Sequence, residues 1–135
     1  MRKIDKIIIH CSATPEGRGC TVADIDRWHR ERGFSEIGYH YVVYLDGSVH
    51  EGRDIAKTGA HCKGQNARSI GICYVGGMDA AGKQPKDTRT PQQKAALRAL
   101  VAQLKQEYPG ATVHGHNEFA AKACPCFDAK AEYGP

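Results

Sequence analysis

The residues most able to do chemistry in this chain are concentrated near its C-terminal end, in residues 114–128, which read HGHNEFAAKACPCFD. This segment combines imidazoles, a carboxylate, an amine and thiols, a mixture that neither an apolar core nor a solvated loop requires. His116 and Cys124 are therefore predicted to bind a metal ion. The third predicted ligand is His10, which lies far away in sequence at the end of the apolar run 7–9.

Two histidines and one cysteine suit zinc, because this borderline-soft ion accepts both imidazole nitrogen and thiolate sulfur. Three protein ligands leave a fourth position for water, which is typical of catalytic rather than structural zinc sites. We therefore expect one zinc ion per chain and a hydrolytic reaction, in which zinc activates water and polarises a carbonyl group. Lys122, two residues before Cys124, is close enough in sequence for its ammonium to stabilise the oxyanion.

Two alternatives remain open within the same segment. His114 and His116 alternate by two residues, so on a strand they share a face, and with Cys124 and Cys126 they could form a closed structural zinc site. Glu118 is an alternative general base, or a partner that orients an imidazole.

The pattern of the remaining chain indicates how these residues are brought together. Short apolar, β-branched or aromatic runs predict strands at 6–10, 38–44, 48–53, 69–75 and 111–114, with a hairpin turn at Asp46 and Gly47. Capping motifs predict two helices, one from Thr21 to about Gly33 and one that starts at Thr90 and stops at Pro109. The resulting fold class is α/β, with a central mixed sheet flanked by helices. On the first helix, Trp28 is expected in the core.

Length and composition limit the classes of protein that need considering. A chain of 135 residues, 41% hydrophobic and 25% charged, is expected to form a single domain over residues 1–135. The net charge of +4 is spread along the chain, so nucleic-acid binding gains no support, and no segment is apolar enough for membrane insertion. Without an export signal we expect synthesis in the cytoplasm and six cysteines that are free or bound to metal.

Four blocks of the sequence carry a resemblance to a known family. IIIHCSAT, IGYHYVVYLDGSV, AHCKGQNARSIGICYVGG and HGHNEFAAKACPCFD resemble the zinc N-acetylmuramoyl-L-alanine amidases of the phage T7 lysozyme type, which are related to the peptidoglycan recognition proteins. The resemblance places zinc ligands at His10, His116 and Cys124 and catalytic side chains at Tyr39 and Lys122. It also places His61 in the substrate-binding groove, and it implies a zinc site in a surface cleft.

The expected function is hydrolysis of peptidoglycan at the amide between the lactyl group of N-acetylmuramic acid and L-alanine, by a monomeric phage or prophage endolysin. Such an enzyme would reach the cell wall through a holin, a secretion system or lysis. Two other functions are considered: a peptidoglycan-binding module without catalysis, which would lack the cysteine ligand, and a regulator that binds RNA polymerase. Cys124 favours the enzyme.

Overall fold

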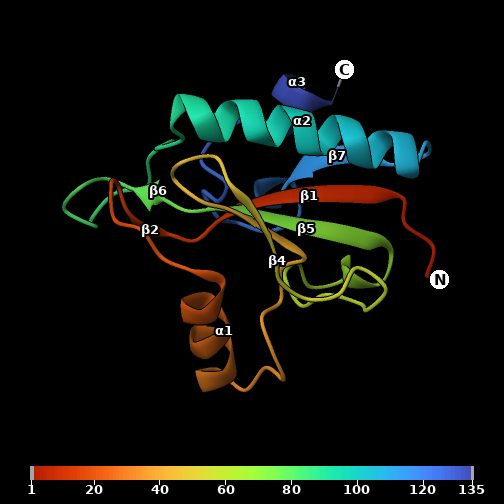
Figure 1. The fold of residues 1–135 in the computed structure, drawn as a ribbon, viewed down its shortest axis with the longest axis horizontal. Coiled ribbons are helices and arrows are strands. Elements are labelled where there is room, and N and C mark those ends of the chain that lie inside the picture. The colour runs from red at the N-terminus through yellow and green to blue at the C-terminus, as the bar shows by residue number, and fades with distance from the viewer. Residues whose placement is uncertain (1, 135) are drawn as a thin grey trace.

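A five-stranded mixed sheet forms the centre of the molecule, with the strand order β4-β3-β5-β1-β7 (Figure 1). This computed structural model describes residues 2–134. The strands are β1 (Lys6–Cys11), β3 (Tyr41–Val43), β4 (Val49–Glu51), β5 (Ser69–Tyr74) and β7 (Thr112–Gly115). β4 is antiparallel to β3, and the other neighbours in the sheet are parallel. The predicted α/β class with a mixed sheet is confirmed.

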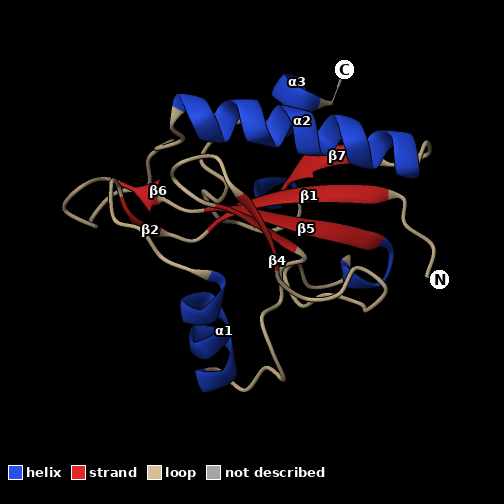
Figure 2. Ribbon diagram, in the orientation of Figure 1, coloured by secondary structure: helices blue, strands red, loops and turns tan. Residues whose placement is uncertain are grey.

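Helices lie on both sides of this sheet. The long helix α2 (Pro91–Glu107) runs along one face. The short helix α3 (Ala129–Tyr133), near the C-terminus of the chain, lies beside α2 (Figure 2). The helix α1 (Val22–Glu31) stands on the opposite side of the sheet. No helix within residues 2–134 combines the length and the hydrophobicity that a membrane span needs.

The central strand β1 is buried on both faces. Ile7, Ile8 and Ile9 are each 0% exposed, as the short apolar run predicts. Because side chains alternate along a strand, Ile7 and Ile9 pack in the core beneath α2, whereas Ile8 and His10 lie on the opposite face. The register of β1 thus determines the side of the sheet on which His10 is presented.

Both long helices begin at the predicted capping boxes. Thr21 caps α1 in a reciprocal pair with Asp24, and Thr90 caps α2 in the same way with Gln93. Gln93 has a second role, because its fully buried amide donates hydrogen bonds to the carbonyls of Val43 and Val75, at 3.3 and 2.9 Å. This contact ties the start of α2 to the sheet.

The strand predicted at 38–44 is shorter in the structure and begins only at Tyr41. Residues 38–40 form other hydrogen bonds: the Gly38 carbonyl accepts from the Ala60 amide, and the Gly38 amide donates to the ring of His29. The carbonyls of Tyr39 and His40 still accept the amides of Arg53 and Gly52, just beyond β4. The contacts of Gly38 place Tyr39 beside the loop that contains His61.

Several small elements have no counterpart in the sequence prediction, among them α3 and the paired strands β2 (Thr14–Pro15) and β6 (Gly77–Met78). The helix α3 is held by Arg89, whose guanidinium contacts Glu132 at 2.6 Å and also stacks on the ring of Phe127. These stabilising contacts join residues distant in sequence, so local patterns do not reveal them. All six cysteines are free thiols in this structure.

Candidate active site and metal site

His10 lies at the centre of a cluster of aromatic side chains at the C-terminal end of β1. Its ring is 1% exposed, and its centroid lies 4.6 Å from that of His116, 4.9 Å from that of His61 and 5.1 Å from that of Tyr39. The strand β1 supplies His10, while the other three residues come from separate segments. The fold thus brings together four of the six residues predicted for the site.

His116 and Cys124 come from the segment that follows β7. His116 begins a short 3-10 helix, η2 (His116–Glu118), and Cys124 lies on the loop beyond it. The backbone amide of Cys11 donates to the Cys124 sulfur at 3.2 Å, which fixes the thiol beside the end of β1. One potential ligand atom from each of His10, His116 and Cys124 lies within 4.8 Å of the other two. These are the three predicted ligands, and their spacing can hold a metal ion.

The electrostatics of this group favour metal binding over protonation. Burial lowers the pKa of His10 well below its usual value, and the neighbouring His61 and His116 lower it further. The pKa of His116 is also lowered, first by burial and then by the charge of Lys122. Both imidazoles are therefore neutral at neutral pH, which is the form that coordinates a metal.

The two predicted catalytic side chains border the same group. The ring of Tyr39 lies between the rings of His10 and His29, with centroids at 5.1 and 5.2 Å. Burial and the nearby thiols raise the pKa of Tyr39 well above its usual value, so its phenol keeps its proton and can donate a hydrogen bond. Lys122 is exposed on the loop before Cys124 and lines the cleft described next.

A surface cleft of about 860 Å³ is lined by two of the three potential ligands, His116 and Cys124, whereas the third, His10, is buried beside them. Its walls include His61, Tyr39 and Lys122, together with Trp28 from α1. Trp28 is 36% exposed, so the prediction that it lies in the core is wrong. Ile25 and His29, the buried residues of α1, line the same cleft as the partly exposed Trp28.

The charge of the cleft lining has one sign. Among the described residues, the lining contains the cationic side chains Arg32, Lys63 and Lys122 and no aspartate or glutamate. Arg32 and Lys63 were not singled out from the sequence. In the sequence, the position of Lys63 two residues after His61, in the block AHCKGQN, is the one feature that could have indicated a place in the cleft. The cleft is thus suited to a ligand with negative charge.

The residues of the alternative, closed metal site are engaged elsewhere. β7 ends at Gly115, so His116 does not continue the strand that presents His114. The His114 ring bonds Thr112 and Glu118, at 2.7 and 2.9 Å, and the Cys126 thiol donates to the Gly77 carbonyl at 3.3 Å. The structure therefore favours the open group of three ligands over the closed group of four.

Glu118 is likewise occupied by local contacts. One carboxylate oxygen accepts the Gly115 amide at 2.8 Å, and the other contacts the His114 ring. Glu118 is not among the residues that line the cleft. Glu118 instead supports the turn after β7. Its carboxylate is therefore less well placed to act as a general base than the side chains of Tyr39 and Lys122, which line the cleft.

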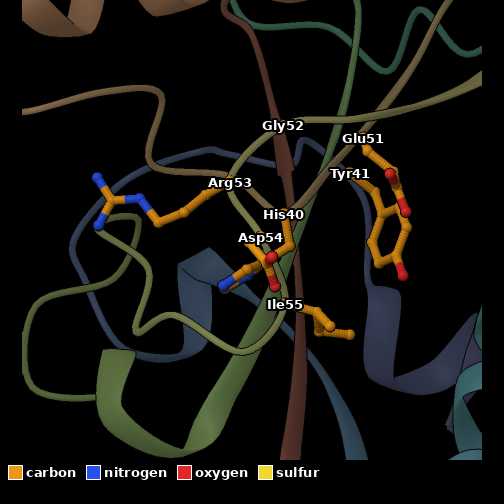
Figure 3. A pocket seen from close by; sticks show the side chains of 7 residues that line it. All are labelled: His40, Tyr41, Glu51, Gly52, Arg53, Asp54 and Ile55. Carbon is orange, nitrogen blue, oxygen red and sulfur yellow. The ribbon is translucent and has the colours of Figure 1, made fainter.

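A smaller hollow of about 300 Å³ lies at the β3–β4 side of the sheet (Figure 3). Tyr41, Glu51 and Asp54 contribute to its lining, and the side chain of Arg53 extends away from them. His40 also lines it, but its buried ring is occupied by the Gly71 amide and the Lys57 carbonyl. None of the three potential metal ligands borders this hollow, so the larger cleft is the candidate active site.

Comparison with known proteins identifies similar sequences along most of the chain. The endolysin of Escherichia phage T7 is 45% identical over 126 residues, which cover 93% of this chain and 83% of that protein. The endolysin of Klebsiella phage KP32 is 44% identical and covers 96% of this chain and 85% of its own.

Solved structures share the fold. The N-acetylmuramoyl-L-alanine amidase LysC from Clostridium intestinale superposes with a TM-score of 0.81 at 30% identity, covering 97% of this chain and 82% of that chain. Drosophila PGRP-LB superposes with a TM-score of 0.77 at 26% identity, covering 93% of this chain and 76% of that one. The family model described as N-acetylmuramoyl-L-alanine amidase matches residues 1–127. The chain therefore belongs to the N-acetylmuramoyl-L-alanine amidase family.

Proposed function

We propose that this peptidoglycan amidase is a zinc enzyme, that residues 1–135 form its single catalytic domain, and that one zinc ion is bound by His10, His116 and Cys124. The observation that carries the proposal is the convergence of two imidazoles and a thiol, within 4.8 Å of one another, at a large cleft that His116 and Cys124 line. This donor set fits zinc, because magnesium and calcium prefer oxygen ligands. Three ligands also leave room for water, as catalysis requires.

The reaction is hydrolysis of the amide between the lactyl group of N-acetylmuramic acid and L-alanine. Zinc bound by the three ligands supplies Lewis acidity, which polarises the scissile carbonyl and makes water a stronger nucleophile at neutral pH. Lys122 lies in the cleft beside His116, where its ammonium stabilises the negative charge that develops on the carbonyl oxygen. Tyr39 keeps its phenolic proton and donates a hydrogen bond to the reacting group or takes part in proton transfer.

The cleft also supports an anionic substrate. Arg32 and Lys63 add positive charge to that of Lys122, and no carboxylate in the described lining offsets it. We propose that these side chains attract the carboxylates of the stem peptide, while His61 contributes to the cleft wall next to the scissile bond. This long-range attraction is screened by salt, so substrate affinity should fall as ionic strength rises.

One experiment tests this function directly. The zinc content of the purified protein is measured, and the protein is then incubated with cell-wall peptidoglycan. The masses of the released products are determined by mass spectrometry. We expect one zinc per chain and free stem peptides that begin with L-alanine, with the glycan strands intact. Release of glycan fragments, or full activity after verified removal of the metal, would contradict the proposal.

The two alternative functions make different predictions. A binding module would retain muropeptide without releasing product, but the position of Cys124 in the ligand group favours catalysis. Binding of RNA polymerase is tested separately, by adding the protein to a transcription assay. As a monomeric endolysin, the protein would be made in the cytoplasm and reach the wall through a holin, a secretion system or lysis.

A further inference from the structure

The imidazole of His61 contacts the predicted zinc ligand His10 directly. Nδ1 of His61 lies 2.8 Å from Nε2 of His10, and Nε2 of His61 lies 3.3 Å from the hydroxyl of Ser69. The three side chains are buried: His10 is 1% exposed, Ser69 0% and His61 9%. His10, His61 and Ser69 thus form a hydrogen-bonded chain that leads away from the potential metal site into the protein.

The position of the His61 ring is fixed by its surroundings. A Cβ atom at Gly71 would come within 2.6 Å of the ring, and one at Gly59 within 2.7 Å, so both glycines leave the space that the ring fills. The side-chain oxygen of Asn66 accepts the backbone amides of His61 and Cys62, each at 2.9 Å, and holds the loop in place. A side chain held this closely can orient its neighbour.

The contact determines which nitrogen of His10 is available to a metal. A ring nitrogen that takes part in a hydrogen bond cannot also coordinate an ion, so the contact with His61 leaves Nδ1 of His10 as the coordinating atom. Neutral His10 then carries its proton on Nε2 and donates it to Nδ1 of His61. His61 in turn carries its proton on Nε2 and donates it to Ser69, so every position in the chain is satisfied.

We propose that His61 is a positioning residue, which holds His10 in the tautomer that binds zinc through Nδ1 and fixes the orientation of its ring. The proposal rests on the proposed zinc site. His61 is not itself one of the grouped ligand residues, so the fourth coordination position stays open. Loss of such a partner typically weakens metal affinity by about 10- to 100-fold.

Zinc affinity, measured by competition with a chromophoric chelator, tests the proposal without an activity assay. His61→Leu removes the hydrogen-bond acceptor and should weaken zinc binding by roughly 10- to 100-fold. His61→Asn offers an amide oxygen near the position of Nδ1 and should recover most of the affinity. The matched control is His50→Leu, because His50 stacks on Tyr44 outside the cleft, and its zinc affinity should equal that of the unmodified protein.

The tautomer of His10 can be measured in the unmodified protein, so this second test does not require any variant to fold. Long-range proton–nitrogen correlation spectra of the zinc-loaded protein should show the His10 proton on Nε2. A proton on Nδ1, or His61→Leu protein that is folded and binds zinc as tightly as the unmodified protein, would overturn the inference. If the unmodified protein binds no zinc, the proposed zinc site is wrong as well, so the two failures are distinguishable.

Discussion

The two faces of the central sheet are built from the same strands but carry different side chains around His10. The face beneath α2 contains Ile7, Ile9, Ile70 and Ile72, all fully buried in an apolar core. The other face presents His10 from β1, next to the segment that holds His61. Alternation along each strand produces this difference, since neighbouring residues point to opposite sides.

The residues of β5 show how the second face accommodates polar side chains. The α2 face of β5 has isoleucine at positions 70 and 72, whereas the opposite face has Gly71 and Cys73. Because Gly71 has no side chain, the ring of His61 can pack against its backbone. Isoleucine side chains therefore fill the face beneath α2, whereas on the other face Gly71 leaves space for an imidazole ring. Substitutions on the two faces should consequently affect different properties.

The largest effect is expected from removing a proposed zinc ligand. Cys124→Ala leaves two histidines, which seldom hold zinc in an open site, so zinc should be lost during dialysis. Amidase activity should fall by roughly 1,000-fold or more, because the metal contributes several kcal/mol to catalysis. Zinc content by atomic emission and product release by mass spectrometry check this. Retention of zinc and activity would remove Cys124 from the ligand set.

Removing a catalytic side chain should separate chemistry from metal binding. Tyr39→Phe and Lys122→Ala should each lower kcat by roughly 100-fold, the usual effect of losing a proton-transfer or oxyanion-stabilising group. Zinc content and muropeptide affinity, measured by calorimetry, should change little, because both groups act mainly in the transition state. Full turnover in Lys122→Ala, with loss of turnover in Glu118→Ala that still holds zinc, would transfer the role to Glu118.

A substitution on the apolar face should show the opposite pattern. Leu97 on α2 is fully buried, and Leu97→Ala should lower the free energy of unfolding by about 2–5 kcal/mol through the cavity that it leaves. Urea denaturation of the metal-free protein measures this loss. The zinc stoichiometry and kcat of the folded fraction should be unchanged. A fall in kcat as large as that of Tyr39→Phe would show that the two faces are not independent.

The buried histidines His40 and His61 should make stability depend on pH. Burial lowers the pKa of His40 to about 4 and that of His61 to about 3, well below the usual value for histidine. Between pH 7 and pH 5 the unfolded chain therefore binds protons that the folded protein excludes, so stability is complete above about pH 6.5 and decreases as pH falls.

The expected slope is roughly 1 kcal/mol per pH unit for each such histidine in the metal-free protein. Urea midpoints at half-unit intervals between pH 7 and pH 5 provide the measurement, above the range in which most carboxylates titrate. Stability that stays constant or rises toward pH 5 would show that these rings accept protons in the folded state.

The smallest effect is expected at Cys126. Its thiol bonds the Gly77 carbonyl and lies outside the group of three ligands, so Cys126→Ser should keep zinc, activity and stability near their original values. A serine hydroxyl can donate the same hydrogen bond. Loss of zinc in this variant would favour the closed site with four ligands.

Local patterns in the sequence were sufficient to predict the main elements of the fold. The apolar run 7–9 predicted the buried strand β1, and the capping boxes at Thr21 and Thr90 predicted the starts of α1 and α2. Each signal depends on residues a few positions apart, which is the range over which strand alternation and helix capping act. Residue type and family resemblance likewise indicated His10, His116 and Cys124, which the fold places together.

Other features depended on contacts between distant residues, and only the tertiary structure decided them. Trp28 has the spacing of a core residue, yet it is 36% exposed and lines the cleft, beside the buried Ile25 and His29. The contact of His61 with His10 spans 51 positions and depends on the space left by Gly71. The sequence determined which side chains were available for chemistry, whereas the packing of separate segments decided which of them meet, because burial and hydrogen bonding between such segments leave no local pattern.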